Sequence, residues 1–209
     1  MRSAVILAGG QSTRLGRDKG LLSLADKTII QRVYDSMREV AEEVVIAVSS
    51  QKQQASYFRL LGRCTFVLDL RKHVGPLAGL VSGLDAVCGK KVAVVGCDMP
   101  FASRTLFRLL FELCVRQDAV IPRWPNGYIE PLHSVYDSAN CLMAAKKALK
   151  SGHRDIRSMI SHLEHTLFVS TETIREIDPD LSMFMNINTR IDLQKARQIV
   201  VTRDLRRAK

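Results

Sequence analysis

Short, wholly apolar segments alternate with longer amphipathic ones along residues 1–122. Five apolar segments are predicted to be buried strands: "SAVILA" (3–8), "EVVIAV" (43–48), "TFVLD" (65–69), "KVAVVGCD" (91–98) and "AVIP" (119–122). Helices are predicted between them, at 28–41, 53–62, 77–88 and near 103–116, and Thr28 and Gln31 have the spacing of a capping box. Apolar strands that alternate with helices are typical of a parallel sheet covered on both faces.

The pattern changes after residue 122. The turn signal Asn126-Gly127 in "RWPNGYIEPLHSVY" predicts a hairpin or edge-strand excursion near 123–136. Further elements are predicted as helices near 138–150 and 155–163, strands "TLFVS" and "MFMNIN" (183–188), and a last helix capped by Thr189. With 209 residues, the chain is predicted to form a single α/β domain, residues 1–209, with three α/β/α layers and a mostly parallel, Rossmann-like sheet.

The composition argues against several classes of protein. The five cysteines are scattered without a C-x-x-C pair, which favours a reducing cytoplasm over a disulfide framework or a zinc site. The sequence shows neither a signal-peptide pattern nor an apolar run long enough for a membrane span, so we expect a cytoplasmic protein. The net charge of +10 is spread along the chain without aromatic-basic interleaving. This favours a small polyanionic substrate over specific binding of nucleic acid.

Polar or flexible residues follow each of the first four predicted strands. They are Gly9-Gly10, Ser49-Ser50, Asp69 and Asp98. Because ligands of parallel α/β sheets gather at the carboxyl ends of the strands, we expect these residues to converge on one edge of the sheet.

The first of these turns has the character of a phosphate site. Its glycines let a ligand approach the main chain, and Arg14, Arg17 and Lys19 supply positive charge beside exposed amides. It is not a P-loop, because five residues separate Gly10 from Gly16, and the dinucleotide motif G-x-G-x-x-G is absent from the sequence.

Asp98 ends the fourth strand in "VVGCDMP". A carboxylate at this position is suited to hold Mg²⁺ together with phosphate oxygens and water. The residue could equally cap the helix predicted near 103. The sequence pattern alone leaves both interpretations open.

Five motifs together resemble the molybdenum cofactor guanylyltransferase family. They occur in the family's order between residues 7 and 189: "LAGGQSTRLGRDK", "GPLAGL" (75–80), "GCDMPF" (96–101), "EPLHSVY" (130–136) and "NINT" (186–189). The first motif alone marks the wider nucleotidyltransferase group, whose sheet is of the nucleotide-diphospho-sugar transferase type. The resemblance implies transfer of GMP from GTP to the terminal phosphate of molybdopterin, with Mg²⁺ as cofactor and release of pyrophosphate. Proteins of molybdoenzyme maturation are possible further partners.

The resemblance also implies roles for residues in a nucleotide-binding half, about 1–122. Lys19 and Arg14 would neutralise the triphosphate, although either could be a solvated surface charge, and Asp98 would bind Mg²⁺. Asp69 matches a nucleotide-binding aspartate of the family. The base and ribose-phosphate would lie against the remaining nucleotide-side residues: Leu7, Ala8, Gly9, Gly10, Gly75, Leu77 and Gly79. Ser49 stands near a base-contacting position where relatives often have asparagine, which leaves guanine recognition open.

The acceptor-binding half is expected at about 123–209. Asn186 and Asn188 match a motif that contacts the metal or the acceptor, although asparagines before a helix also stabilise turns. Glu130 and His133 match the region in which the family shapes its acceptor site.

The chemistry of the implied reaction agrees with the residues present. A phosphate monoester already carries close to two negative charges at neutral pH, so its attack needs no general base. The obstacle is the repulsion between polyanions, about 4 kcal/mol per pair of unit charges at 4 Å and an effective dielectric of 20. Lys, Arg and a metal ion can offset it.

Three alternatives remain open at this stage: a molybdopterin cytidylyltransferase, a nucleotidyltransferase with another small phosphate acceptor, and a GTP-binding delivery protein without turnover. The paired glycines and "GPLAGL" favour guanine over cytosine, because absent side chains leave room for a purine.

Overall fold

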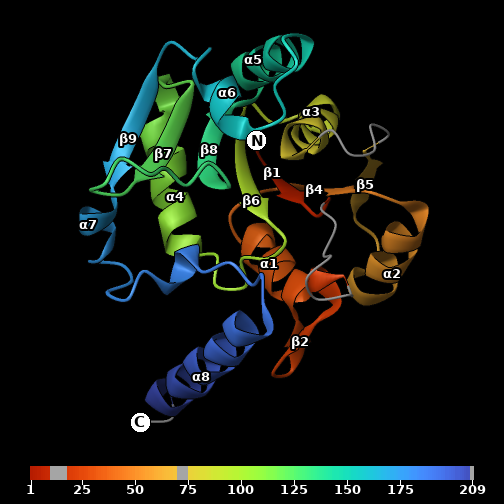
Figure 1. The fold of residues 1–209 in the computed structure, drawn as a ribbon, viewed down its shortest axis with the longest axis vertical. Helices are drawn as coiled ribbons and strands as arrows, with labels where there is room; N and C mark the ends of the chain where they lie inside the picture. Colours follow the sequence, from red (N-terminus) through yellow and green to blue (C-terminus); the bar gives the residue numbers. More distant parts are fainter. Residues whose placement is uncertain (10–17, 70–74, 208–209) are drawn as a thin grey trace.

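A seven-stranded sheet forms the centre of the computed structural model, which describes residues 1–9, 18–69 and 75–207. The strand order is β5-β4-β1-β6-β8-β7-β9 (Figure 1). The strands are β1 (Arg2–Leu7), β4 (Glu43–Val48), β5 (Thr65–Leu68), β6 (Lys91–Gly96), β7 (Ala119–Arg123), β8 (His133–Asp137) and β9 (Thr166–Ser170). Neighbours from β5 to β6 are parallel, as are β7 and β9, which confirms the predicted sheet. Gly10, Arg14 and Arg17 lie outside the described residues.

β8 is placed differently from the expected edge excursion. It lies inside the sheet and runs antiparallel to both β6 and β7. Across the turn before it, Arg123 and Ile129 form an isolated bridge, and Gly127 has a φ of 83°. The residues from His133 to Tyr136 are all buried, because a central strand is covered on both faces. Of the two predicted forms, the hairpin is confirmed, because β8 directly follows β7 and pairs with it antiparallel, whereas the edge position was wrong.

Helices cover both faces of the sheet (Figure 1). One face carries α1 (Ile29–Arg38), α2 (Gln51–Leu61) and α4 (Arg104–Leu113), and the other α3 (Pro76–Ala86), α5 (Ser138–Lys150) and α6 (Ile156–Ile160). After β9 come α7 (Thr171–Ile174) and α8 (Arg190–Arg207), which adds Ala196 and Val200 to the core of the first face. Among the described residues, no helix combines the length and apolar character needed to cross a membrane.

Side chains of β1 show how one strand serves two cores. Ala4 and Ile6 pack with α1 and α4, whereas Val5 and Leu7 pack with α3, because successive side chains of a strand point to opposite faces. All four are at most 7% exposed. Burial of each of the larger ones, Val5, Ile6 and Leu7, stabilises the fold by about 1.5–3 kcal/mol.

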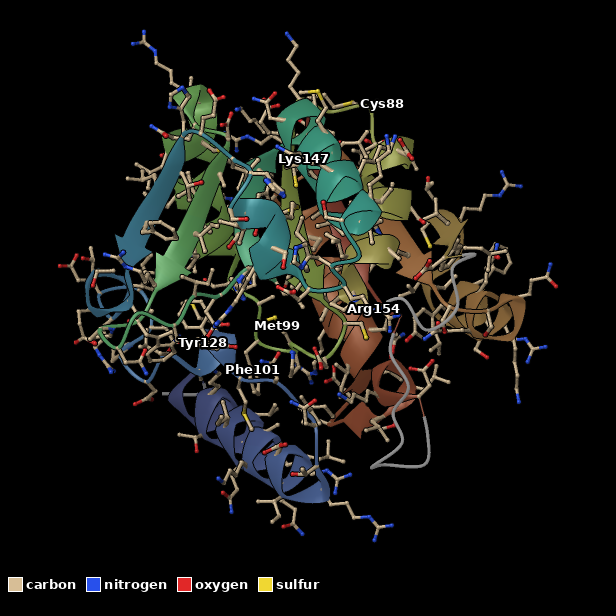
Figure 2. All side chains as sticks on the ribbon, turned by 45° about the horizontal axis from the view of Figure 1, so that its top comes forward. Cys88, Met99, Phe101, Tyr128, Lys147 and Arg154 are labelled. Atoms are coloured by element: carbon tan, nitrogen blue, oxygen red, sulfur yellow. The ribbon has the colours of Figure 1, made fainter. Side chains whose placement is uncertain are left out.

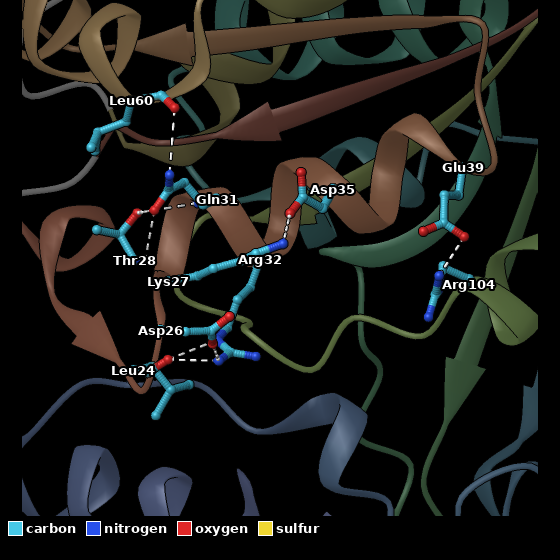
Figure 3. Close-up of polar contacts among 10 residues, drawn as sticks. All are labelled: Leu24, Asp26, Lys27, Thr28, Gln31, Arg32, Asp35, Glu39, Leu60 and Arg104. Atoms are coloured by element: carbon cyan, nitrogen blue, oxygen red, sulfur yellow. Dashed lines mark hydrogen bonds and ion pairs between the residues drawn. The ribbon is translucent and has the colours of Figure 1, made fainter. Parts of the chain in front are cut away.

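The predicted capping box at α1 is present (Figure 3). The Thr28 hydroxyl accepts a hydrogen bond from the Gln31 N–H at 3.4 Å, and Gln31 Oε1 accepts one from the Thr28 N–H at 2.9 Å. Gln31 also donates to the carbonyl of Leu60 at 3.4 Å, which ties α1 to α2. At the start of α8, Thr189 Oγ1 accepts from the N–H of Asp192 at 3.1 Å, so the predicted cap is also confirmed.

The segment 183–188 does not form the expected strand. Ser182–Phe184 is a 3₁₀ turn, and Met183 and Phe184 are both buried although they are consecutive. The N–H of Ile187 donates to the Asp98 carbonyl at 2.9 Å instead of joining a strand ladder. The segment therefore crosses the carboxyl edge of the sheet and ends beside Asp98.

Candidate active site

The carboxyl ends of the four parallel strands meet at one edge, as expected. The N–H of Ala8 donates to the Ala47 carbonyl at 2.8 Å, and the N–H of Cys97 donates to the Leu7 carbonyl at 3.0 Å. The N–H of Asp69 donates to the Val48 carbonyl at 2.8 Å. These bonds continue the strand ladders past their ends, so the residues that follow the strands lie along one rim.

Lys19 and Asp98 face each other at this rim. The two residues are 79 positions apart in the sequence, and Lys19 Nζ lies 3.2 Å from Asp98 Oδ2. The Lys19 ammonium also donates to Oδ1 of Asn188, which comes from the segment that precedes α8. The side chains of Lys19 and Asp98 are 21% and 22% exposed. The structure therefore brings together three predicted site residues from three distant parts of the chain.

The position of the Asp98 carboxylate depends on the glycine two residues before it. A Cβ atom at Gly96 would lie 2.7 Å from Asp98 Oδ1, which is too close for any other residue without a shift. The Asp98 side chain does not cap α4. The N-cap is Ser103, whose hydroxyl accepts from the N–H of Leu106 at 3.3 Å. The capping alternative for Asp98 is thus excluded by the structure, and its carboxylate faces the rim.

A cavity of about 130 Å³ lies between these groups. The residues that line it come from the ends of β1 and β6, the Lys19 turn, the start of α3 and the loop before β8: Leu7, Ala8, Gly9, Asp18, Lys19, Pro76, Gly96, Cys97, Asp98 and Leu132. Asp18 and Leu132 were not predicted as site residues. Leu132 is apolar and has no chemical signature in the sequence.

A larger cavity of about 590 Å³ lies elsewhere, between α1, the loop before α4 and α8. Ion pairs line its walls, among them Lys27–Asp35 at 2.7 Å and Arg104–Glu39 (Figure 3). Phe101, which is labelled in Figure 2, is one of its lining residues. The guanidinium of Arg203 on α8, another lining residue, lies 4.9 Å from the centre of the Phe101 ring. The smaller cavity, and not this one, lies at the carboxyl ends of the parallel strands, where ligands of such sheets bind.

The predicted nucleotide-side residues occupy the start of α3 and the end of β5. Gly75 is the N-cap of α3, and Leu77 is buried, with its N–H donating to the Arg154 carbonyl at 3.2 Å. A Cβ at Gly79 would lie 3.7 Å from Asp69 Oδ2, so the Asp69 carboxylate lies against α3.

Ser49, which follows β4, is exposed, and its N–H and hydroxyl both donate to Gln53 Oε1, at 2.9 and 3.1 Å.

The predicted acceptor-side residues differ in their exposure. Asn186 is exposed and Asn188 half-buried, whereas Glu130 and His133 are buried and do not line the cavity. Glu130 Oε1 accepts a hydrogen bond from Trp124 Nε1 at 2.7 Å, and burial raises the pKa of its carboxyl above the usual range. Glu130 and His133 therefore lie in the core and not at the cavity wall.

His133 stacks on Phe107, with ring centres 4.7 Å apart, and meets Phe184 edge-on at 5.1 Å. Among the described residues, neither of its ring nitrogens has a hydrogen-bond partner. Burial lowers the pKa of His133 to about 3, so the ring is neutral at physiological pH. This packing anchors Phe184, which lies in the turn leading to Asn188.

The buried histidine predicts a loss of stability in acid. Below its unfolded pKa of about 6.5 the unfolded chain binds a proton that the folded chain does not, so stability falls by about 1.4 kcal/mol per pH unit until the folded pKa. His133→Phe should remove a loss of about 2–3 kcal/mol between pH 7 and pH 4.5. Urea unfolding of both proteins at the two pH values measures this difference. If the free energy of unfolding had the same pH dependence in the parent and in His133→Phe, the low pKa of His133 would be contradicted.

The donor atoms at the rim are suitable for a divalent metal. Within residues 1–9, 18–69 and 75–207, no cluster of three or more His, Cys, Asp or Glu side chains is arranged to hold a metal ion. Asp98 and Asn188 nevertheless bring a carboxylate and an amide oxygen to one cation, the Lys19 ammonium. Mg²⁺ in nucleotide sites is commonly held by one or two carboxylates together with substrate phosphates and water. The residues present therefore fit such an ion.

Solved structures share this architecture. Molybdopterin-guanine dinucleotide biosynthesis protein A from Archaeoglobus fulgidus is 28% identical and superimposes with a TM-score of 0.80. The match covers 97% of this chain and all of that chain. A Mycobacterium tuberculosis protein in complex with manganese, 15% identical, shares the fold with a TM-score of 0.64 over 94% of this chain and 98% of that chain. The shared fold, together with the match of the sequence to an NTP transferase domain, makes the chain a nucleotidyltransferase.

The sequence comparisons identify the family. The profile of the MobA-like NTP transferase domain matches residues 4–167, and the chain belongs to this family. A Methanosarcina mazei protein named probable molybdenum cofactor guanylyltransferase is 36% identical over 92% of this chain and 88% of its own length. A Natronomonas pharaonis protein of the same name is 34% identical over 94% and 97%. The resemblance inferred from the five motifs is thereby confirmed.

Proposed function

We propose that this nucleotidyltransferase transfers GMP from GTP to the terminal phosphate of molybdopterin, releasing pyrophosphate and forming the guanine dinucleotide form of the molybdenum cofactor. The observation that carries the proposal is the ion pair Lys19–Asp98, with Nζ and Oδ2 3.2 Å apart, in the lining of the cavity at the carboxyl edge of the sheet. The relatives named molybdenum cofactor guanylyltransferase supply the choice of substrates.

The chain's own groups meet the electrostatic demand of this reaction. The acceptor phosphate is already close to a dianion at neutral pH and attacks the α-phosphorus of GTP without help from a base. Lys19 provides positive charge where the triphosphate and acceptor approach each other, and this lowers the repulsion that forms the barrier. The amino end of α3 adds partial positive charge at the same cavity, because Pro76 in its first turn lines it.

Asp98, with Asn188, would hold Mg²⁺ at the rim. When bound, this ion would neutralise phosphate oxygens of the nucleotide and of the leaving pyrophosphate. Asp98 would keep its carboxylate fixed through Gly96 and the Ile187–Asp98 backbone bond. Asn186, exposed near Asn188, would contact the acceptor.

The proposal divides the chain into a nucleotide-binding half, about 1–122, and an acceptor-binding half, about 123–209. Arg14 and Gly10 would contribute to the triphosphate site from the first half. The acceptor half meets the nucleotide half through Leu132, which lines the same cavity as Ala8 and Asp98, and through Asn188, which accepts a hydrogen bond from Lys19. Both halves contribute strands to the same sheet.

Guanine is the proposed base because small residues border the site. Gly9 follows β1 and lines the cavity, and no atom of the described residues, its chain neighbours aside, lies within 4 Å of where a Cβ would be, so main chain and not a side chain would face the base there. Gly75 and Gly79 would shape the wall behind it, where Gly75 lies against Arg154 and Gly79 against Asp69 and Leu7. A purine needs this room more than a pyrimidine does. Ser49 would face the same region with a hydroxyl that can still accept a hydrogen bond.

A turnover assay tests the proposal. The protein is incubated with Mg²⁺, molybdopterin and either GTP or CTP, and pyrophosphate is measured. We expect release that depends on molybdopterin, with kcat/KM at least about tenfold higher for GTP than for CTP. A preference for CTP would replace the guanylyltransferase by a cytidylyltransferase. Nucleotide binding without pyrophosphate release from either nucleotide would contradict the transfer reaction.

A further inference from the structure

Asp18, beside Lys19, is a carboxylate in a cavity proposed for polyanions. Both of its carboxylate oxygens accept hydrogen bonds from other groups of the protein. Oδ1 accepts from the Tyr57 hydroxyl at 2.8 Å and from the Gly20 N–H at 2.9 Å, and Oδ2 accepts from Gln53 Nε2 at 2.8 Å. Hydrogen bonds to an ionised carboxylate are about twice as strong as neutral ones. Asp18 is therefore held by α2 and the turn that follows it.

Gln53 connects this carboxylate to the sheet. Its amide nitrogen also donates to the Ala8 carbonyl at 2.9 Å, at the end of β1. Its Oε1 accepts from the N–H of Ser49 at 2.9 Å, just after β4. One side chain thus fixes the Asp18 turn against the ends of two central strands.

Tyr57 is one helical turn after Gln53 and points to the same carboxylate. It is fully buried, and burial raises the pKa of its hydroxyl, which therefore stays protonated and donates. The approach is close: a Cβ at Gly20 would lie 2.2 Å from the Tyr57 hydroxyl oxygen. Glycine at position 20 is what allows Tyr57 to reach Asp18.

Lys19 lies in the chain between Asp18 and Gly20, which are joined by a hydrogen bond. Asp18 is the N-cap of the 3₁₀ turn Lys19–Leu21, so fixing Asp18 fixes the start of that turn and the direction in which Lys19 leaves it. A long lysine side chain has many rotamers, and its charge helps catalysis only when its backbone is held so that Nζ meets Asp98 and Asn188.

We propose that Tyr57 and Gln53 are positioning residues that hold Lys19 in the active site through Asp18. The inference rests on the proposed function for one point, which is that Lys19 acts on the nucleotide. Tyr57 and Gln53 are on α2, outside the sequence motif that contains Lys19, and neither of them lines the cavity.

The kinetic test uses a double-mutant cycle. Tyr57→Phe removes one hydroxyl and should lower kcat about tenfold, with KM for GTP changed less than about threefold, because a misplaced Lys19 weakens the transition state more than binding. In the Lys19→Ala background the same change should lower kcat by less than about twofold, because the group being positioned is gone. Equal losses in both backgrounds would overturn the proposal.

A second readout needs no turnover. The rate at which a lysine-selective reagent labels Lys19, relative to Lys146 in the same sample, is followed by mass spectrometry. We expect Tyr57→Phe and Gln53→Leu each to raise the relative rate at least about threefold, because Lys19 leaves its partners more often. Unchanged labelling in both variants would overturn the inference even if the parent enzyme is active. Changed labelling in a protein without guanylyltransferase activity would reject only the proposed function.

The matched control is Tyr34→Phe, which removes the hydroxyl of another buried tyrosine, on α1. It should change neither the Lys19 labelling rate nor kcat by more than about 1.5-fold. Thermal unfolding of all variants shows that the fold persists. A Tyr34→Phe effect as large as that of Tyr57→Phe would assign the Tyr57 result to general loss of stability and overturn the positioning role.

Discussion

Asp98→Asn is expected to lower kcat/KM at least about 10³-fold, corresponding to about 4 kcal/mol, while the protein stays folded. The amide has the shape of the carboxylate but not its charge, so it would bind a divalent ion much more weakly and would not form an ion pair with Lys19. The ion pair is only partly buried, with both side chains more than a fifth exposed, so its loss should shift the melting temperature by less than about 4 °C. Pyrophosphate release and thermal unfolding measure the two effects.

The chain offers a closely matched control for this variant. Lys91 and Asp137 form an ion pair of 3.1 Å with 21% and 24% exposure, close to the 3.2 Å and 21% and 22% of Lys19–Asp98. Lys91 begins β6, whereas Asp98 follows its end, so the control pair lies at the opposite edge of the sheet. Asp137→Asn should cost similar stability and leave kcat/KM within about twofold. An active Asp98→Asn protein would remove the metal assignment.

Lys19→Ala is expected to cost about 2–4 kcal/mol of transition-state stabilisation, a fall of about 30- to 900-fold in kcat/KM. The loss should appear mainly in kcat, because repulsion between the polyanions is greatest where the new bond forms. Lys91→Ala removes an equivalent ammonium from the other edge of the sheet and serves as the control. The measurement is steady-state pyrophosphate release with GTP and molybdopterin varied in turn. A rate within threefold of the parent would withdraw the phosphate role from Lys19.

Local sequence patterns predicted most of the elements, with bounds that differ from those of the structure by at most a few residues. The strand at 43–48 and the helix at 138–150 have the same bounds in the structure as in the prediction. Such elements are decided by hydrophobic period and by caps, which involve residues a few positions apart. The capping box of Thr28 and Gln31 belongs to the same class of information.

The motifs likewise indicated Lys19, Asp98 and Asn188, and the parallel-sheet rule indicated that the ends of the strands would share a rim. What these patterns could not supply was the partner of each residue. The contacts of Asp18 with Gln53 and Tyr57 span 35 and 39 positions, and neither partner belongs to a motif.

Two features of the fold were decided only in three dimensions. β8 enters between β6 and β7, and 183–188 crosses the rim instead of forming a strand. The alternating pattern of each segment is compatible with an edge strand, a central strand or an irregular crossing. The choice depends on which hydrogen-bonding edges and apolar faces other parts of the chain leave available.

The sequence by itself thus determined the parallel sheet, the helices and the chemical character of the rim, because local period and residue type suffice for these. Only the tertiary structure decided that His133 and Glu130 are buried, that Ser103 and not Asp98 caps α4, and that α2 holds the Lys19 turn. These outcomes depend on packing between segments far apart in the chain, and packing is a property of the folded whole.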